Sequence, residues 1–247
     1  MLPEVQELAR LEADQAELKE QVAAAELALQ TVKTETAQFQ HRYYQAVGRL
    51  YAELDELDAR ISRAHAEQAP ENILLDAQAE AARGKADKSA EEAGVIETKP
   101  KPLRVISPEM KEAYRRAVKL VHPDLAVAEP ERQRRTKLMA VVNLAYERGD
   151  QRAIEKLLEE IAEEPEAIVG EDVGSRIVRA IRRIAQLCRR LGELQQTLDA
   201  CQRTETFQLG QTVRQAEAKG EDPLGDLARQ LKRQISERQN RLKVLGR

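Results

Sequence analysis

The tripeptide His122-Pro123-Asp124 brings together three side chains suited to the recognition of another protein. Pro123 fixes its own backbone torsion and removes one hydrogen-bond donor, so the turn keeps one shape. Asp124 offers an acceptor to an arginine or to backbone donors of a partner. His122 donates or accepts a hydrogen bond depending on its tautomer. His122 also fits a helix C-cap that binds nothing, so the flanking sequence has to decide between the two interpretations.

The rest of the sequence lacks the patterns of common catalytic and metal sites. It has no glycine-rich phosphate loop, no nucleophile elbow and no pair of carboxylates that differs from the acidic background. Its histidines are scattered. Cys188 and Cys201 fall in one predicted helix, about 20 Å apart along its axis, which is too far for a disulfide. We therefore expect a cytoplasmic protein that is not an enzyme and needs no cofactor or metal.

Signals for short helices surround the tripeptide. Ser107-Pro108 predicts an N-cap and a first helical turn, so a helix should cover 109–121. Pro123 ends this helix, because the residue before a proline disfavours helical torsions. Two further helices are predicted at 131–148 and 151–162, separated by a Gly-Asp stop. The tripeptide therefore connects the first two helices of a compact helical module.

The helices on both sides of the tripeptide carry two further motifs. Ala-Tyr-Arg-Arg at 113–116 lies in the first helix, and Asn-Leu-Ala-Tyr at 143–146 lies in the second. In this arrangement residues 107–164 resemble the J-domain, the module by which DnaJ-type co-chaperones engage seventy-kilodalton heat-shock (DnaK-type) chaperones. The resemblance implies two antiparallel core helices with a His-Pro-Asp turn between them. It also implies that His122, Pro123 and Asp124 contact the chaperone.

The first helix of this module has a basic face and an apolar face. Lys111, Arg115 and Lys119 step by four and share one side, which Arg116 flanks. In J-domains the corresponding face meets an acidic surface of the chaperone, and the match is residue for residue at Arg115 and Arg116. A solvated charged face is the alternative. The residues expected in the core of the module are Tyr114, Ala117, Val118, Val121, Met139, Val142, Asn143 and Tyr146.

The sequence departs from the J-domain pattern in two places. The usual first helix is absent before Ser107, and we expect either the apolar segment 73–75 or the N-terminal coiled coil to replace it. Leu125 and Ala126 follow the tripeptide in place of the common lysine and asparagine. A scaffold or adaptor protein with an inactive J-like module is therefore the alternative function. Whether the His-Pro-Asp turn is exposed or covered by the flanking segments distinguishes the two functions.

Residues 1–65 predict a coiled-coil helix. Apolar residues recur at alternating steps of three and four from Leu8 onward, and after Tyr43 the phase moves by one position, so that Val47 leads a second stripe to Ile61. We interpret this shift as a stutter, which locally unwinds a supercoil. A helix with such a stripe needs a partner helix. A second copy of the chain and the C-terminal helices both fit, and we expect a homodimer.

The two remaining segments are a linker and a C-terminal pair of helices. Residues 66–106 are rich in Ala, Glu, Asp and Lys and interrupted by Gly and Pro, which predicts a polar linker with at most a short helix from 71 to about 83. Residues 172–247 predict an antiparallel hairpin, with one helix to about Lys219 and another after Pro223.

The formal net charge of −3 is unevenly distributed along the chain. It is −7 over 1–106, −4 over 107–172 and +8 over 173–247. We expect attraction between the acidic and basic segments of the protein. Binding of the basic run to nucleic acid or anionic lipid is the weaker alternative, because the run lacks interleaved aromatics for base stacking. This run consists of Arg176, Arg179, Arg182, Arg183, Arg189 and Arg190.

The composition favours an all-α protein without a membrane span. Hydrophobic residues make up 42%, charged residues 34% and aromatic residues 3% of the chain, and strong helix formers dominate. No apolar run approaches the roughly 18 to 20 residues that cross a bilayer. We predict a J-domain-like helical module between an N-terminal coiled-coil helix and a C-terminal antiparallel helical hairpin. The predicted function is a co-chaperone that stimulates the ATPase of a DnaK-type chaperone, with coiled coils that form a dimer or select an unidentified client.

Overall fold

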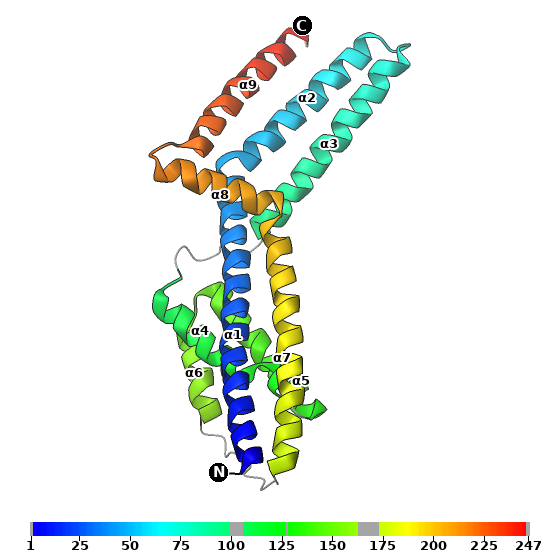
Figure 1. The fold of residues 1–247 in the computed structure, drawn as a ribbon. Coiled ribbons are helices and arrows are strands. Elements are labelled where there is room, and N and C mark those ends of the chain that lie inside the picture. Colours follow the sequence, from blue (N-terminus) through cyan, green and yellow to red (C-terminus); the bar gives the residue numbers. More distant parts are fainter. Residues whose placement is uncertain (1, 99–105, 127, 163–172, 246–247) are drawn as a thin grey trace. The chain divides into compact units, whose positions relative to one another are not determined.

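The computed structural model describes residues 2–98, 106–126, 128–162 and 173–245, and all regular structure in these ranges is helical (Figure 1). The predicted all-α class is confirmed. In chain order the elements are α1 (Pro3–Tyr43), the π-helical turn η1 (Tyr44–Gly48), α2 (Arg49–Gln68), α3 (Ile73–Thr98), α4 (Pro108–Val121), the 3-10 turn η2 (Pro123–Leu125), α5 (Glu129–Arg148), α6 (Gln151–Ala162), α7 (Val173–Gln202), α8 (Glu205–Ala218) and α9 (Pro223–Leu245). Among the described helices none is both long and apolar enough to cross a membrane.

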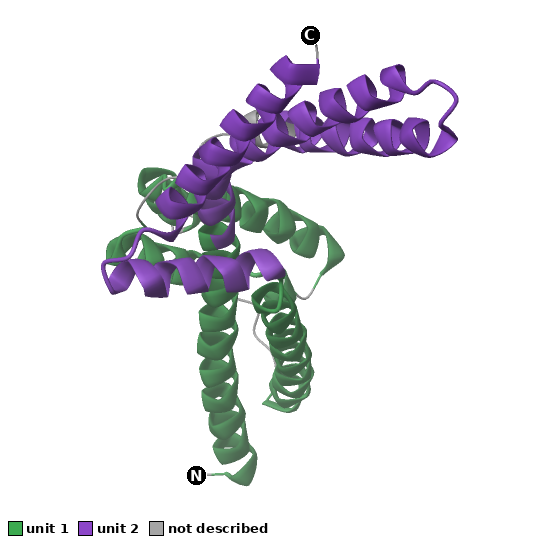
Figure 2. Ribbon diagram, turned by 90° about the horizontal axis from the view of Figure 1, so that it is seen from above, with its two compact units in different colours: residues 1–35, 102–204 green, residues 36–101, 205–247 purple. Residues whose placement is uncertain are grey.

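The chain forms two compact units that do not follow the predicted segment boundaries (Figure 2). Unit 1 consists of residues 1–35 and 102–204, and unit 2 of residues 36–101 and 205–247. The predicted coiled-coil segment is therefore divided between the units, and so is the predicted C-terminal hairpin. Each unit combines an early and a late part of the chain, which local sequence signals do not reveal.

In unit 1, α1 and α7 form a parallel pair of helices (Figure 1). Val22 and Leu29 of α1 pack with Leu187 and Leu194 of α7 in one buried cluster. These positions recur every seven residues, which is the spacing of a coiled-coil seam. The C-terminal helices were one of the two partners predicted for the stripe of α1, and α7 fills that role here. Because α7 covers the apolar stripe of α1, the stripe does not require a second copy of the chain. The homodimer stays a prediction.

The helical module of unit 1 consists of α4, η2, α5 and α6. Its core cluster contains all the residues predicted for it except Asn143, together with Ile154 and Leu157 of α6. Asn143 lies beside this cluster, where its Oδ1 accepts a hydrogen bond of 2.7 Å from the hydroxyl of Tyr114. The rings of Tyr114 and Tyr146 lie 4.6 Å apart and both side chains are fully buried. Aromatic packing therefore joins α4 to α5.

Capping residues fix the ends of the module's helices at the predicted places. The Oγ of Ser107 accepts a hydrogen bond of 3.1 Å from the backbone amide of Met110, as an N-cap does. Gly149 has φ 65° and ends α5 in the left-handed region that glycine adopts readily. Asp150 then caps α6, since its Oδ1 accepts from the amide of Ala153 at 3.1 Å. The start of α4, the end of α5 and the start of α6 are thus determined by local sequence.

In unit 2 the phase shift after Tyr43 corresponds to the π-helical turn η1. A π-helical turn accommodates one extra residue, so the buried face moves by one position. Our interpretation as a supercoil stutter was wrong in mechanism, although the place was right. Gly48 is required here, because a Cβ at this position would lie 2.3 Å from Cδ2 of the buried Tyr44 ring.

The predicted linker over 66–106 is wrong for most of its length, because residues 73–98 form the helix α3. Its last part, 99–105, lies outside the described residues. This helix packs along α2 (Figure 1). Its buried contacts use small residues, and Ser89 donates a hydrogen bond of 2.6 Å to the buried carboxylate of Asp55, which also pairs with Lys85 at 2.8 Å. We interpreted Gly84 as a break, but it lies on the open side of the helix, where a glycine is tolerated.

The predicted C-terminal hairpin is also wrong. The helix from 173 ends at Gln202, where the hydroxyl of Thr204 donates to the carbonyl of Cys201 at 2.7 Å and takes the chain out of the α-helical pattern. α8 comes next, and α9 begins at the N-cap Asp222, whose Oδ1 accepts from the amide of Gly225 at 3.0 Å. α9 packs along α2 within unit 2, whereas α7 belongs to unit 1.

Candidate functional site

The His-Pro-Asp turn lies between two antiparallel helices, as predicted. Tyr114 of α4 contacts Asn143 of α5, and near the turn Nη1 of Arg135 donates to the carbonyl of Leu120 at 3.2 Å. The order of these contacts makes α4 and α5 antiparallel. Residues Pro123–Leu125 form the 3-10 turn η2 that joins them. The rigid turn is therefore mounted at one end of a well-packed helix pair.

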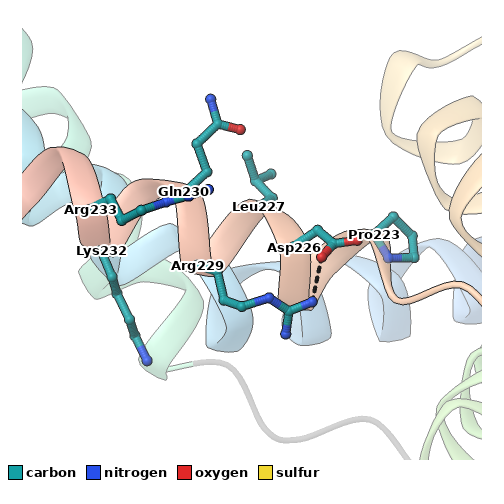
Figure 3. Close-up of a pocket in the computed structure, with 7 residues that line it drawn as sticks. All are labelled: Pro223, Asp226, Leu227, Arg229, Gln230, Lys232 and Arg233. Atoms are coloured by element: carbon teal, nitrogen blue, oxygen red, sulfur yellow. Dashed lines mark hydrogen bonds and ion pairs between the residues drawn. The ribbon is translucent and has the colours of Figure 1, made fainter.

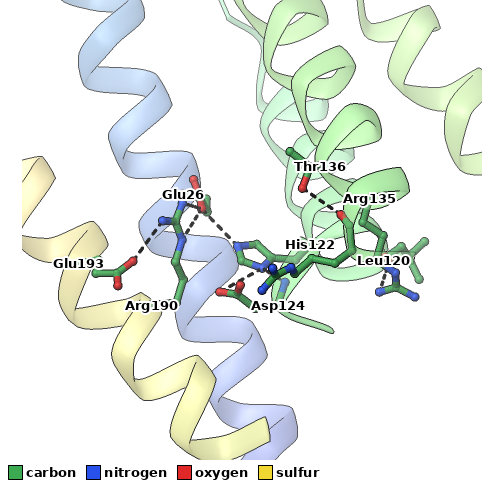
Figure 4. A network of polar contacts seen from close by, with 9 residues as sticks. Glu26, Leu120, His122, Asp124, Arg135, Thr136, Arg190 and Glu193 are labelled. Carbon is green, nitrogen blue, oxygen red and sulfur yellow. Dashed lines mark hydrogen bonds and ion pairs between the residues drawn. The ribbon is translucent and has the colours of Figure 1, made fainter. Parts of the chain in front are cut away.

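His122 is buried rather than exposed, and it belongs to a polar network with α1 and α7 (Figure 4). Only 3% of His122 is accessible to solvent. Its Nε2 lies 3.3 Å from Oε1 of Glu26, and the same oxygen accepts a hydrogen bond of 2.6 Å from Nη2 of Arg190. We call Glu26, His122 and Arg190 the turn latch. It joins the turn to both helices of the parallel pair.

The hydrogen bonds of His122 assign its tautomer. Nδ1 accepts from the backbone amide of Asp124 at 3.2 Å, so in the neutral ring the proton is on Nε2 and is donated to Glu26. Burial alone would raise the pKa of Glu26, but the hydrogen bonds from His122 and Arg190 outweigh it and lower this pKa below its ordinary value. Glu26 is therefore a charged acceptor between two donors.

Leu125 anchors the turn in the seam between α1 and α7. It packs against the buried cluster that contains Val22 and Leu187. This leucine is one of the two departures from the J-domain pattern, in which a lysine is common at this place. An apolar side chain here has a physical reason, because it buries surface that a lysine would have to leave in water. The leucine found in place of the common lysine therefore attaches the turn to the seam between α1 and α7.

The four basic residues predicted to bind a chaperone have different surroundings. Arg115 and Arg116 are exposed, and Lys111 is half-buried. Within the described ranges none of these three has an ion pair. Lys119 instead pairs with Glu20 of α1. In the described ranges the face thus keeps two guanidinium groups without an ion pair, on the helix before a turn in which His122 is buried and Pro123 and Asp124 are half-buried.

Of the two replacements considered for the missing first helix, only α1 packs on the module. Ala23 of α1 is part of the module's core cluster. The hydroxyls of Thr31 and Tyr146 are 3.0 Å apart, and Nε2 of Gln30 donates to Glu147 at 2.9 Å. Segment 73–75 begins α3 in unit 2, where Ile73 is 83% exposed. Helix α1, and not segment 73–75, therefore provides the additional helix that packs on the module.

Sequence reasoning missed Glu26 and Arg190 as parts of the site. The sequence predicts a basic run, including Arg190, that is solvated or paired within the protein, but it does not identify Glu26 as the partner. Glu26 and Arg190 pair because α1 and α7 run parallel and in register. The heptad spacing of the apolar residues in the two helices is the sequence signal for that alignment. Arg176 and Arg190 both pair with glutamates of α1, as expected for an internally paired basic run.

A separate groove lies along α9, lined by residues of that helix alone (Figure 3). Its cations include Arg229, which contacts Asp226. The groove is open and holds no converging polar groups from other elements, so it gives no catalytic arrangement. Comparisons of this chain with family models, with curated proteins and with solved structures found no match to any of them.

Proposed function

We propose that this protein is a J-domain-type co-chaperone of a DnaK-type chaperone, and that the structure described here is its covered state. The proposal is carried by the antiparallel α4–α5 pair, which is joined by a rigid His-Pro-Asp turn and carries Arg115 and Arg116 on α4 without ion pairs among the described residues. In this function the reaction is ATP hydrolysis by the partner, and the present chain supplies a contact surface.

The basic face supports a partner with an acidic surface. Arg115 and Arg116 stay unpaired in the described part of a chain in which many other arginines have a carboxylate neighbour. Long side chains held free on a helix are available for charge-assisted hydrogen bonds with carboxylates. The chain has its own acidic groups on α1, and only Lys119 of the basic face has engaged one of them.

The burial of His122 favours one alternative, a scaffold or adaptor whose J-like module is inactive. In that function the turn latch is a permanent structural contact between the module and the α1–α7 pair. The two functions predict different effects of removing the latch. A covered co-chaperone gains stimulation, whereas a scaffold gains nothing.

The test is single-turnover ATP hydrolysis by a DnaK-type chaperone in the presence of three forms of the full chain. These are the wild type, Glu26→Ala, and Glu26→Ala combined with His122→Gln. We expect weak stimulation by the wild type, stronger stimulation by Glu26→Ala and none by the combined variant. Asp124→Asn in place of His122→Gln gives a second loss-of-contact variant, in case the buried histidine is needed for folding.

His65→Gln serves as the matched control, since this histidine lies on α2 in the other unit. It should leave stimulation unchanged. Absence of stimulation by every form, with circular dichroism showing folded proteins, refutes the co-chaperone function and favours the scaffold. Equal stimulation with and without His122→Gln shows that the turn is not the contact.

A further inference from the structure

The parallel pair of α1 and α7 carries a ladder of charges along one edge. Nη2 of Arg176 donates to Glu12 at 2.6 Å, and Nη2 of Arg190 donates to Glu26 at 2.6 Å. In each pair the two residues are 164 positions apart in the chain. Helices α1 and α7 therefore keep the same register from the Glu12–Arg176 pair to the Glu26–Arg190 pair, which we call two rungs of the ladder. With Val22 and Leu29 at a positions and Leu187 and Leu194 at d positions, the glutamates occupy e and the arginines g. Such e–g pairs stabilise coiled coils.

The middle rung of this ladder joins two cations. The position one heptad after Glu12 is Lys19, and the position one heptad after Arg176 is Arg183. The same register therefore sets Lys19 against Arg183, where a Glu–Arg pair is expected. Like charges at facing e and g positions destabilise a coiled coil. A site of this kind is unfavourable unless an anion lies between the two groups.

No carboxylate of the described residues neutralises this rung. Neither Lys19 nor Arg183 has a hydrogen bond or ion pair there, and both are half-buried. Burial, together with the smaller effect of the charges of Arg183 and Arg135, lowers the pKa of Lys19. Burial, together with the smaller effect of the charges of Arg179 and Arg135, lowers the pKa of Arg183. The cations of three helices therefore gather around one point of the α1–α7 edge.

Arg135 is held in place beside the rung by its own contacts. Its Nε donates to Glu131 at 2.7 Å and its Nη1 donates to the carbonyl of Leu120 at 3.2 Å. These two bonds fix the guanidinium on α5, near the end of α4. Arg135 is paired with Glu131 and keeps Nη2 as the nitrogen that can add a donor to the facing pair of Lys19 and Arg183.

We propose that Lys19, Arg183 and Arg135 form a binding site for a phosphate-type oxyanion. A guanidinium presents parallel N–H donors to two oxygens of such a group, and an ammonium adds a compact point charge. The half-buried setting across a packed seam suits one small anion better than an extended acidic peptide. The ligand is free phosphate or the phosphoryl group of a nucleotide. This site is independent of the proposed co-chaperone function.

The test is thermal unfolding of the full chain at rising inorganic phosphate, with chloride adjusted to constant ionic strength. The wild type should show a saturable rise in Tm of about 2 to 4 °C, the shift that about 1 kcal/mol gives in a chain of this size. Lys19→Glu completes the ladder with a Glu–Arg rung. It should raise Tm in chloride alone and abolish the phosphate effect. Arg183→Gln should abolish the phosphate effect and raise Tm in chloride by less than Lys19→Glu, because it removes the repulsion without adding an opposite-charge pair.

Lys33→Glu is the matched control, because it makes the same charge change at the next free e position of α1, which faces the uncharged Thr197. It should keep the phosphate response of the wild type. The same titration is repeated with ATP. If ATP saturates the rise in Tm at a lower concentration than phosphate does, the ligand is a nucleotide. If ATP binds as weakly as phosphate or more weakly, the ligand is free phosphate. Equal phosphate shifts in wild type, Lys19→Glu and Lys33→Glu would overturn the site. A rise in Tm with polyglutamate but not with phosphate would also overturn the site.

Discussion

Replacing Gly48 by alanine tests the origin of the π-helical turn. The added Cβ would lie 2.3 Å from Cδ2 and 2.9 Å from Cε2 of Tyr44, well inside ordinary van der Waals contact. The ring cannot move away freely, because Tyr44 is only 7% exposed. Overpacking of this kind costs about 1 to 3 kcal/mol. The higher helix propensity of alanine offsets about 1 kcal/mol of that cost.

Gly84→Ala is the matched control, since a Cβ there meets nothing within 4 Å. It should stabilise unit 2 by up to about 1 kcal/mol, so the difference between the two variants isolates the steric cost at Gly48. The assay is urea unfolding followed by circular dichroism. We expect Gly48→Ala to be less stable than Gly84→Ala by about 1 to 3 kcal/mol. Equal stabilisation by both substitutions would refute the close packing of Tyr44 on Gly48.

Single contacts give three further predictions. The lowered pKa of Glu26 means that its stabilising effect is complete above the unfolded-state value near 4.5 and is lost as pH falls through the folded-state pKa. Glu26→Gln should therefore flatten the acid limb of a plot of unfolding free energy against pH, and an unchanged limb would contradict the latch. Leu125→Ala should lower stability by about 1 to 2 kcal/mol and speed chemical modification of His122, whereas the same change at the exposed Leu74 should do neither. Tyr114→Phe should cost about 1 kcal/mol in urea unfolding, because it removes the hydrogen bond between α4 and α5, and a neutral result would contradict that bond.

Local signals in the sequence were sufficient for the helical module. The N-cap at Ser107 and the stop at Gly149 depend only on a few neighbouring residues, and each was predicted at its position. The apolar face of α4 is set by helical spacing. The phase change after Tyr43 was visible in the same way, because a π-helical turn moves the apolar stripe by one residue.

Choices between partners could not be predicted, because they depend on contacts between distant segments. The helix at 73–98 looked like a linker, since its stability comes from packing along α2 and from Asp55, and not from an apolar stripe of its own. No local sequence signal indicates that α7 and α9 belong to different units. The burial of His122 likewise required knowing that Glu26 faces the turn.

The measurement that tests the central claim most directly is a charge-reversal cycle at the turn latch. Glu26→Lys places a cation against Arg190, and Arg190→Glu places an anion against Glu26, so each single change should open the latch. The double change restores an opposite-charge pair at the same place. Stimulation of single-turnover ATP hydrolysis by a DnaK-type chaperone is compared for the four forms.

A covered co-chaperone predicts greater stimulation by each single variant than by the wild type. The double variant should return only part of the way, because it restores the α1–α7 charge pair but not the acceptor of His122. Coupling of this kind isolates the interaction between the two side chains from their separate effects. Circular dichroism and urea unfolding of all four forms establish that they are folded. Stimulation that is absent from every form, or that is the same in the single and double variants, would contradict the account.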